Sequence, residues 1–114
     1  MDNYKQWLGK KVKVAIDRPL NSAHPDYPQN KYQTNYGFIP GTKSEADGEE
    51  IDAYILGPDK PLVNFDGIVI AVVLRENDGE IKLIVTDGAD FSFEEIDRQI
   101  YYVEKYHPHK IVKK

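Results

Sequence analysis

The stretch from Gly67 to Thr86 reads Gly-Ile-Val-Ile-Ala-Val-Val-Leu-Arg-Glu-Asn-Asp-Gly-Glu-Ile-Lys-Leu-Ile-Val-Thr. Both of its ends are rich in β-branched residues, which favour strands. The four residues between them, Glu-Asn-Asp-Gly at 76–79, are typical of a tight turn. We therefore expect two strands, 67–75 and 80–86, that pair antiparallel as a hairpin.

The apolar residues of this hairpin predict how its strands pair. If Leu74 lies opposite Ile81, one face is entirely apolar and contains Ile70, Val72, Leu74, Ile81, Leu83 and Val85. The opposite face then carries Arg75, Glu80 and Lys82 near the turn. We expect this charged tip to face water or a ligand.

Three more strands are expected before the hairpin. Residues 11–17 alternate, with Val12, Val14 and Ile16 on one side, as in a half-buried strand. Shorter strands are expected at 36–39 and 51–56, each followed by a Pro-Gly or Gly-Pro pair. The connection 18–34 shows no such pattern, and loops of this length are often functional.

The residues after the hairpin predict one amphipathic helix. Ser92 and Glu95 have the spacing of a capping box, and apolar residues follow at helical intervals: Phe93, Ile96, Ile100 and Val103. We expect this helix to run to about Tyr106, before Pro108. The chain is thus predicted to be one α+β domain, residues 1–114, mainly β, with a small five-stranded barrel and a C-terminal helix packed on it.

Composition narrows the classes of function. The chain has 114 residues, of which 40% are hydrophobic and 30% charged, and it has no cysteine, which excludes disulfides and thiolate chemistry. The net charge is -4 and the lysines are dispersed, so we do not expect nucleic acid as the main ligand. No segment approaches the ~18 apolar residues of a membrane span, and we expect a cytoplasmic protein without a membrane partner.

Acidic residues gather between Glu45 and Asp52, a run that repels itself unless solvent or a cation intervenes. Together with the hairpin tip, they form a set of hard oxygen ligands with cationic and phenolic donors: Lys13, Tyr36, Asp47, Glu49, Asp52, Asp78, Glu80, Lys82 and Tyr106. Carboxylate oxygens suit Mg²⁺, which joins protein ligands to substrate phosphates, while Lys and Tyr can hold the remaining phosphate oxygens. The pattern indicates a shared metal and phosphate site.

Two motifs in the sequence resemble those of the soluble, family I inorganic pyrophosphatases. The segment 32–39, Tyr-Gln-Thr-Asn-Tyr-Gly-Phe-Ile, is similar to the family's Tyr-x-x-Asn-Tyr-Gly-Tyr-Ile, and the segment 47–52, Asp-Gly-Glu-Glu-Ile-Asp, to its Asp-Gly-Asp-Pro-x-Asp. The later segment 78–82, Asp-Gly-Glu-Ile-Lys, is similar to the family's Asp...Asp-x-Lys on a shortened hairpin. The resemblance extends from about Lys13 to Tyr106.

This resemblance implies a barrel of the oligonucleotide/oligosaccharide-binding type that hydrolyses pyrophosphate to two phosphates with Mg²⁺, or with Mn²⁺. It also implies a role for each matching position. Glu49 would accept the proton of the attacking water, the metal ligands would be Asp47, Asp52, Asp78 and Glu80, and the phosphate-binding residues would be Lys13, Tyr36, Lys82 and Tyr106. Bacterial members of the family form oligomers, which makes a homo-oligomer an expectation too.

The sequence also departs from the family's pattern. Glu49 and Glu80 stand where the family has Asp, Ala15 where it has Glu, and His107 where a Lys is usual. No Arg corresponds clearly to the family's phosphate-binding Arg, a role that His24 or Lys31 could fill. Two alternatives therefore stay open: a related phosphohydrolase acting on another phosphoanhydride or ester, and a non-catalytic module that binds metal or phosphate.

Overall fold

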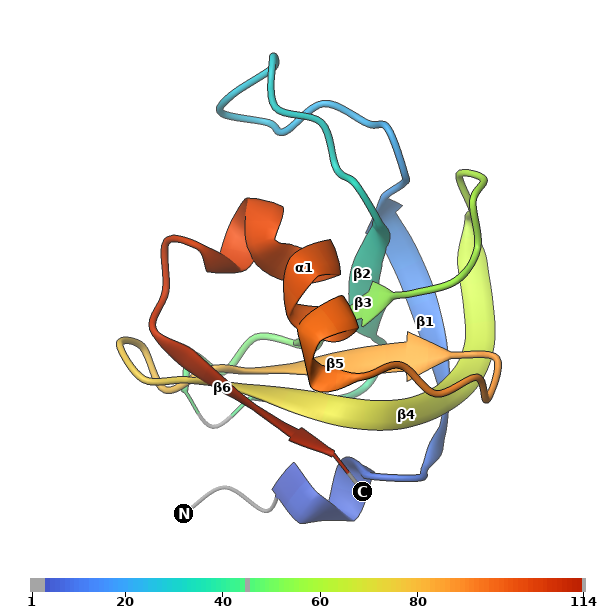
Figure 1. The fold of residues 1–114 in the computed structure, drawn as a ribbon, viewed down its shortest axis with the longest axis vertical. Coiled ribbons are helices and arrows are strands. Elements are labelled where there is room, and N and C mark those ends of the chain that lie inside the picture. The colour runs from blue at the N-terminus through green and yellow to red at the C-terminus, as the bar shows by residue number, and fades with distance from the viewer. Residues whose placement is uncertain (1–3, 45, 114) are drawn as a thin grey trace.

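The structure, a computed structural model, describes residues 4–44 and 46–113, so Glu45 and both ends of the predicted domain lie outside the described residues. Figure 1 shows one barrel with a helix beside it. In chain order the elements are the 3-10 helix η1 (Tyr4–Trp7), β1 (Lys11–Arg18), β2 (Asn35–Ile39), β3 (Ile51–Ile55), β4 (Asn64–Arg75), β5 (Ile81–Thr86), α1 (Phe93–Glu104) and β6 (His109–Lys113).

Five of the strands close into a barrel. Neighbouring strands follow the order β1-β2-β3-β5-β4, and β4 returns to pair with β1. All of these pairs are antiparallel except β3 and β5, which run parallel, so the sheet is mixed. The predicted small five-stranded barrel is confirmed, and its strands match the predicted ranges to within one residue at each end, except that β4 begins at Asn64 and not at Gly67.

The hairpin of β4 and β5 has the predicted register at its tip. Leu74 pairs with Ile81 and Val72 with Leu83, but the register shifts between Val69 and Ala71. Val69, rather than Ile70, therefore lies opposite Val85. The expectation for Ile70 was wrong because this irregularity turns the first half of β4 by one residue, and a one-residue shift moves a side chain to the other face.

The apolar residues form two cores, one on each side of the sheet. The barrel interior contains Val12, Val14, Ile39, Ile51, Ala53, Ile55, Val69, Val72, Leu83 and Val85. The second core lies outside the barrel, where α1 covers the sheet, and contains Tyr54, Leu56, Ala71, Val73, Ile84, Ile96 and Ile100. Because both faces of β3, β5 and the second half of β4 are covered, polar residues there lie in or beside a core.

The helix begins as its sequence predicts. The Ser92 side chain accepts a hydrogen bond from the amide of Glu95 at 3.1 Å, which satisfies one of the free N–H groups of the first turn. Ile96 and Ile100 are fully buried, whereas Phe93 is half exposed. No helix among the described residues is long and apolar enough to cross a membrane.

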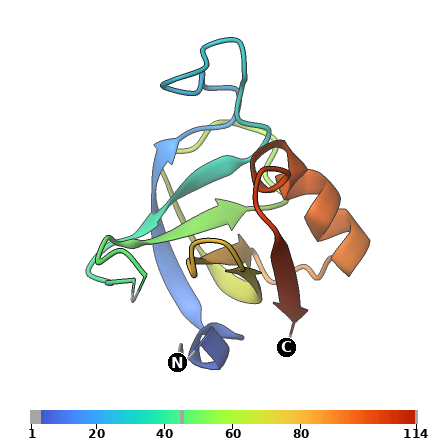
Figure 2. The ribbon, with the colours of Figure 1, turned by 90° about the vertical axis from the view of Figure 1, so that its left-hand side faces the viewer.

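One element was missed by the sequence reasoning. After Pro108 the chain continues as β6, which pairs antiparallel with the second half of β4, residues 71–75. The first half of β4, residues 64–68, pairs with β1. The long strand β4 is therefore shared between the barrel wall and the β6 extension, and Figure 2 shows β6 and α1 together on one side of the barrel.

Candidate active site

Three polar side chains from three adjacent strands meet on the helix side of the sheet. The three residues are Tyr36 of β2, Asp52 of β3 and Lys82 of β5. Asp52 pairs with Lys82 on one side and with Phe38 on the other, and Tyr36 lies two residues before Phe38, on the same face of β2. The Lys82 ammonium lies 2.7 Å from Asp52 Oδ2 and 3.2 Å from the Tyr36 hydroxyl, which itself donates to Asp52 Oδ2 at 2.8 Å. Lys82 is only 4% exposed, so its charge is almost fully desolvated.

The hairpin tip extends this group into a larger network. Glu80 Oε1 lies 3.3 Å from Lys82 Nζ, and Glu80 Oε2 lies 3.4 Å from Arg75 Nη1. The same Arg75 nitrogen lies 3.2 Å from Asp78 Oδ2. We call Tyr36, Asp52, Arg75, Asp78, Glu80 and Lys82 the charged cluster. It joins five of the residues that the sequence predicted to share a site, and the role of each one stays a prediction.

Arg75 is fixed by a partner that the sequence reasoning missed. Its Nε and Nη2 donate to Glu104 Oε1 and Oε2 of α1 at 3.0 and 2.8 Å, and the Tyr54 hydroxyl donates to Oε2 at 2.5 Å. Glu104 is fully buried and the Arg75 side chain is 7% exposed. Of the two expected surroundings of the tip, water or a ligand, water is wrong for Arg75 and Lys82, which are 7% and 4% exposed, and the ligand stays a prediction. The signal was present: Glu104 follows Ile100 by four residues and so lies on the apolar face of the helix.

The surroundings of the cluster change how its groups titrate. Burial raises the pKa of Tyr36 well above its usual value, with help from the Asp52 carboxylate, so its hydroxyl remains a hydrogen-bond donor at neutral pH. Burial also raises the pKa of Glu80, although Lys82 opposes this effect. Burial alone would raise the pKa of Asp78, but the Glu80 amide and Arg75 lower it overall. The two tip carboxylates thus differ in their affinity for a proton.

The other four predicted site residues, all of them described, make no hydrogen bond or ion pair with the charged cluster. Asp47 and Glu49 are exposed on the loop between β2 and β3, where Asp47 Oδ1 accepts a hydrogen bond from the Glu49 amide at 2.9 Å. Lys13 is exposed on β1, opposite Asp66 of β4. Tyr106 is 66% exposed just beyond α1. No hydrogen bond or ion pair joins these four described residues to the cluster.

A basic residue close to the cluster was also missed. Arg18 ends β1 and pairs in register with Tyr36. Its charge reaches Tyr32: burial raises the pKa of the Tyr32 hydroxyl, and Arg18 works against that rise. An arginine is thus present beside Tyr32 and Tyr36, where the sequence reasoning found none.

The charged cluster does not form a metal centre as it is arranged. Its carboxylates have the hard oxygen chemistry that suits Mg²⁺. However, within residues 4–44 and 46–113 no three His, Asp or Glu side chains are grouped so that they could hold one ion. Asp52, Asp78 and Glu80 are instead neutralised by Lys82 and Arg75.

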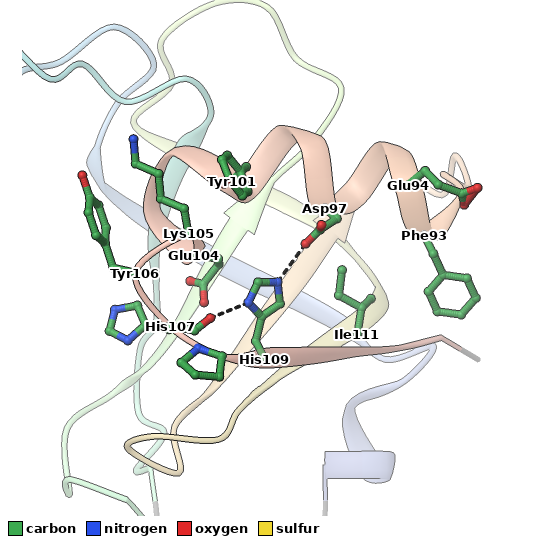
Figure 3. A pocket seen from close by; sticks show the side chains of 11 residues that line it. Phe93, Glu94, Asp97, Tyr101, Glu104, Lys105, Tyr106, His107, His109 and Ile111 are labelled. Atoms are coloured by element: carbon green, nitrogen blue, oxygen red, sulfur yellow. Dashed lines mark hydrogen bonds and ion pairs between the residues drawn. The ribbon is translucent and has the colours of Figure 1, made fainter.

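Two hollows adjoin the end of α1. One is an open groove of about 770 Å³ between α1 and β6, shown in Figure 3. In it His109 Nε2 lies 2.8 Å from Asp97 Oδ1, and His109 Nδ1 lies 2.7 Å from the His107 carbonyl (Figure 3). The other is a cavity of about 380 Å³ between α1 and the β1–β2 connection, and Tyr106 and His107 line both.

The fold and the charged cluster define a small mixed β-barrel protein with a polar site between barrel and helix. A family model described as inorganic pyrophosphatase matches residues 4–111, and the chain belongs to the inorganic pyrophosphatase family. Membership implies dependence on a divalent metal ion in general. A sequence search among curated proteins finds no match.

Solved structures share the fold. The inorganic pyrophosphatase of Ehrlichia chaffeensis is similar with a TM-score of 0.70 and 18% identity, over 93% of this chain and 87% of that one. The inorganic pyrophosphatase of Neisseria gonorrhoeae has a TM-score of 0.66 and 21% identity, over 91% of this chain and 81% of that one. The inorganic pyrophosphatase of Thermus thermophilus has a TM-score of 0.62 and 22% identity, over 90% of this chain and 82% of that one. At these identities the likeness shows the fold, and the predicted barrel of the oligonucleotide/oligosaccharide-binding type is confirmed, with β6 as an addition.

Proposed function

We propose that this chain hydrolyses inorganic pyrophosphate to two phosphates. The observation that carries the proposal is the meeting of Lys82, Tyr36 and Asp52 within 2.7–3.2 Å on adjacent strands. The ammonium and the hydroxyl are donors that suit phosphate oxygens, and they act strongly because the site is desolvated. Membership of the pyrophosphatase family supports the same substrate.

In the proposed reaction each protein group has a defined task. Lys82 and Tyr36 bind oxygens of one phosphate, and Asp52 orients both donors. Glu49 accepts the proton of the attacking water, the new P–O bond forms on one phosphorus, and the bond from that phosphorus to the bridging oxygen breaks. Arg18 supplies the cation beside Tyr36 that offsets charge on the departing phosphate.

The divalent ion that we propose is Mg²⁺, with Mn²⁺ as the alternative, and the family resemblance gives Asp47, Asp52, Asp78 and Glu80 as its ligands. To hold one ion, Asp52, Asp78 and Glu80 would exchange their contacts with Lys82 and Arg75 for the metal, and Asp47 would approach from its loop. The support is the oxygen chemistry of these side chains together with family membership. Lys13 and Tyr106 keep their predicted roles as phosphate ligands. Cytoplasmic location, assembly into a homo-oligomer, and the absence of nucleic-acid and membrane partners also stay predictions from the sequence.

Phosphate release from pyrophosphate, measured with Mg²⁺, with Mn²⁺ and after chelation, tests this function. Asp52→Asn keeps the side-chain shape but weakens its hold on Lys82 and Tyr36, and we expect kcat to fall about 10²-fold. Asp59→Asn is the matched control, because Asp59 lies outside the cluster on the connection between β3 and β4. Equal rates for the wild type and Asp52→Asn would refute the proposal.

The same proteins separate the two alternatives. Hydrolysis rates are measured for a panel of phosphoanhydrides and phosphate esters. If one of these compounds is hydrolysed faster than pyrophosphate, the result favours the related phosphohydrolase. Calorimetry that detects pyrophosphate binding without turnover at any metal tested would favour the non-catalytic module. The departures at Ala15, Glu49 and His107 are the reason to run both experiments.

A further inference from the structure

The cavity between α1 and the β1–β2 connection has two preformed walls. The loop wall is held by its own backbone hydrogen bonds, which join Asn21 to Tyr32, His24 to Asn30 and Asn30 to Tyr27 at 2.8–2.9 Å. The helix wall comes from the last turns of α1 and the residues after it. Figure 1 shows the loop projecting beyond the barrel on the side where α1 ends. A volume of about 380 Å³ lies within the range of small-molecule sites, about 300–1,000 Å³.

The walls of this cavity are aromatic. Four tyrosines and two histidines line it: Tyr27, Tyr32, Tyr102, Tyr106, His24 and His107. The rings of His24 and Tyr32 are almost parallel, with centroids 5.9 Å apart, and the Tyr27 ring lies 5.3 Å from His24. Tyr27 and Tyr106 still expose 57% and 66% of their surface, so a ligand can reach both side chains, although Lys105 Nζ lies over the Tyr106 ring at 5.2 Å from its centroid. Such walls bind flat rings by stacking.

The charge of the cavity favours an anion. Among the described residues that line it there is no Asp or Glu, whereas Lys31 and two histidines contribute basic groups. This is unusual for a chain with a net charge of -4, and the neighbouring groove contains Glu94, Asp97 and Glu104. Lys31 is, however, the one permanently cationic side chain described in the lining. A bare pyrophosphate ion would therefore meet one permanent cation there and make no use of the aromatic rings.

The cavity adjoins the charged cluster at two points. The Tyr32 ring lies 5.6 Å from the Tyr36 ring, whose hydroxyl contacts Lys82. His107 Nδ1 lies 4.0 Å from Asp78 Oδ2. A ligand whose flat group fills the cavity can therefore extend a polar chain toward the cluster.

We propose that this cavity binds the base of a nucleoside diphosphate or triphosphate, with the phosphates directed toward Tyr36 and Lys82. The base stacks on the exposed Tyr27 ring, and Lys31 contacts the ligand's negative charge. The direction of the phosphates rests on the proposed function of the charged cluster, whereas base binding does not. This extends the proposed substrates of the site from pyrophosphate to phosphoanhydrides that carry a nucleoside.

Calorimetry with a matched pair of non-hydrolysable ligands tests the proposal. Adenosine α,β-methylene diphosphate carries the base, and methylenediphosphonate lacks it. We expect the first to bind the wild type about tenfold more tightly, as one stacked base provides. Tyr27→Ala should abolish this difference. Tyr101→Ala is the control, because Tyr101 is equally exposed at 56% but lies outside this cavity.

Equal affinities of the two ligands for the wild type would overturn the proposal, as would an equal effect of Tyr27→Ala and Tyr101→Ala. Phosphate release from pyrophosphate is measured on the same preparations. If that release is absent while the Tyr27-dependent difference is present, the proposed hydrolysis fails and base binding stands. If pyrophosphate is hydrolysed but the base adds no affinity, base binding fails and the hydrolysis stands.

Discussion

Replacing Glu104 by Gln should destabilise the protein strongly, because Glu104 anchors a buried arginine. The carboxylate is fully buried and accepts hydrogen bonds from Arg75 at 3.0 and 2.8 Å and from Tyr54 at 2.5 Å. Burial alone would raise the pKa of Glu104, but the hydrogen bonds from Arg75 and Tyr54 lower it overall, so the group is charged at neutral pH. Gln offers one acceptor where the carboxylate offers two, and its NH₂ group faces a donor.

The magnitude follows from the contacts that the Glu104→Gln variant loses and those that Arg75 keeps. Removing one partner of a buried ion pair costs about 3–5 kcal/mol. Since Arg75 retains Asp78 and Glu80, we expect the lower end, ~3 kcal/mol. With a urea m-value of about 1.5 kcal/mol/M, the unfolding midpoint should fall by roughly 2 M.

Urea unfolding followed by circular dichroism measures this shift. Glu95→Gln is the matched control on the same helix, because its exposed ion pair with Arg98 should contribute at most about 0.5 kcal/mol. A midpoint for Glu104→Gln within error of that for Glu95→Gln would refute the argument. Arg75→Met combined with Glu104→Leu should recover part of the loss, since both charges are then removed together.

Two other predictions concern stability. Burial alone would lower the pKa of His109, but its hydrogen bonds with the His107 carbonyl and Asp97, together with the charge of Glu104, raise it overall. The stabilisation by protonated His109 is therefore complete below pH ~6.5 and is lost as the pH rises through the folded pKa. In urea titrations the free energy of unfolding of the wild type should exceed that of His109→Gln by ~1 kcal/mol at pH 5 and equal it at pH 9. A difference that stays constant with pH would contradict this. A Cβ on Gly37 would lie 1.9 Å from the Ala15 carbonyl oxygen, so Gly37→Ala should lower Tm by roughly 10 °C in thermal melts; a change of only about 2 °C would contradict the packing.

The strands were predictable because their signals are local. The alternation in 11–17 marks β1, and the turn residues at 76–79 mark the β4–β5 hairpin, without any knowledge of the rest of the chain. The register shift between Val69 and Ala71 was not predictable. The residues around it all favour a strand, and no glycine or proline marks Ile70 as the inserted residue. Strand β6 was missed because Pro108 was interpreted only as the end of the helix. Pro is also found at the start of a strand, and β6 begins at the next residue, His109.

The charged cluster was partly predictable for a different reason. Asp52, Glu80 and Lys82 were grouped by their chemistry and motif, and the parallel pairing of β3 with β5 does place them together. Arg75 and Glu104 were not grouped, because 29 residues separate them and each has an ordinary solvent-exposed interpretation alone. Only the packing of α1 over the sheet makes them partners.

The same separation orders events during synthesis. The ribosome releases β4 and β5 before α1 exists, so a nascent chain contains Arg75 without Glu104. At that stage the guanidinium must stay hydrated, and the sheet face that α1 later covers remains open to chaperones and to other chains. Docking of the helix then removes this water and adds the buried Glu104 carboxylate to Asp78 and Glu80 as partners of Arg75. A chain that ends before Glu104 cannot complete this step.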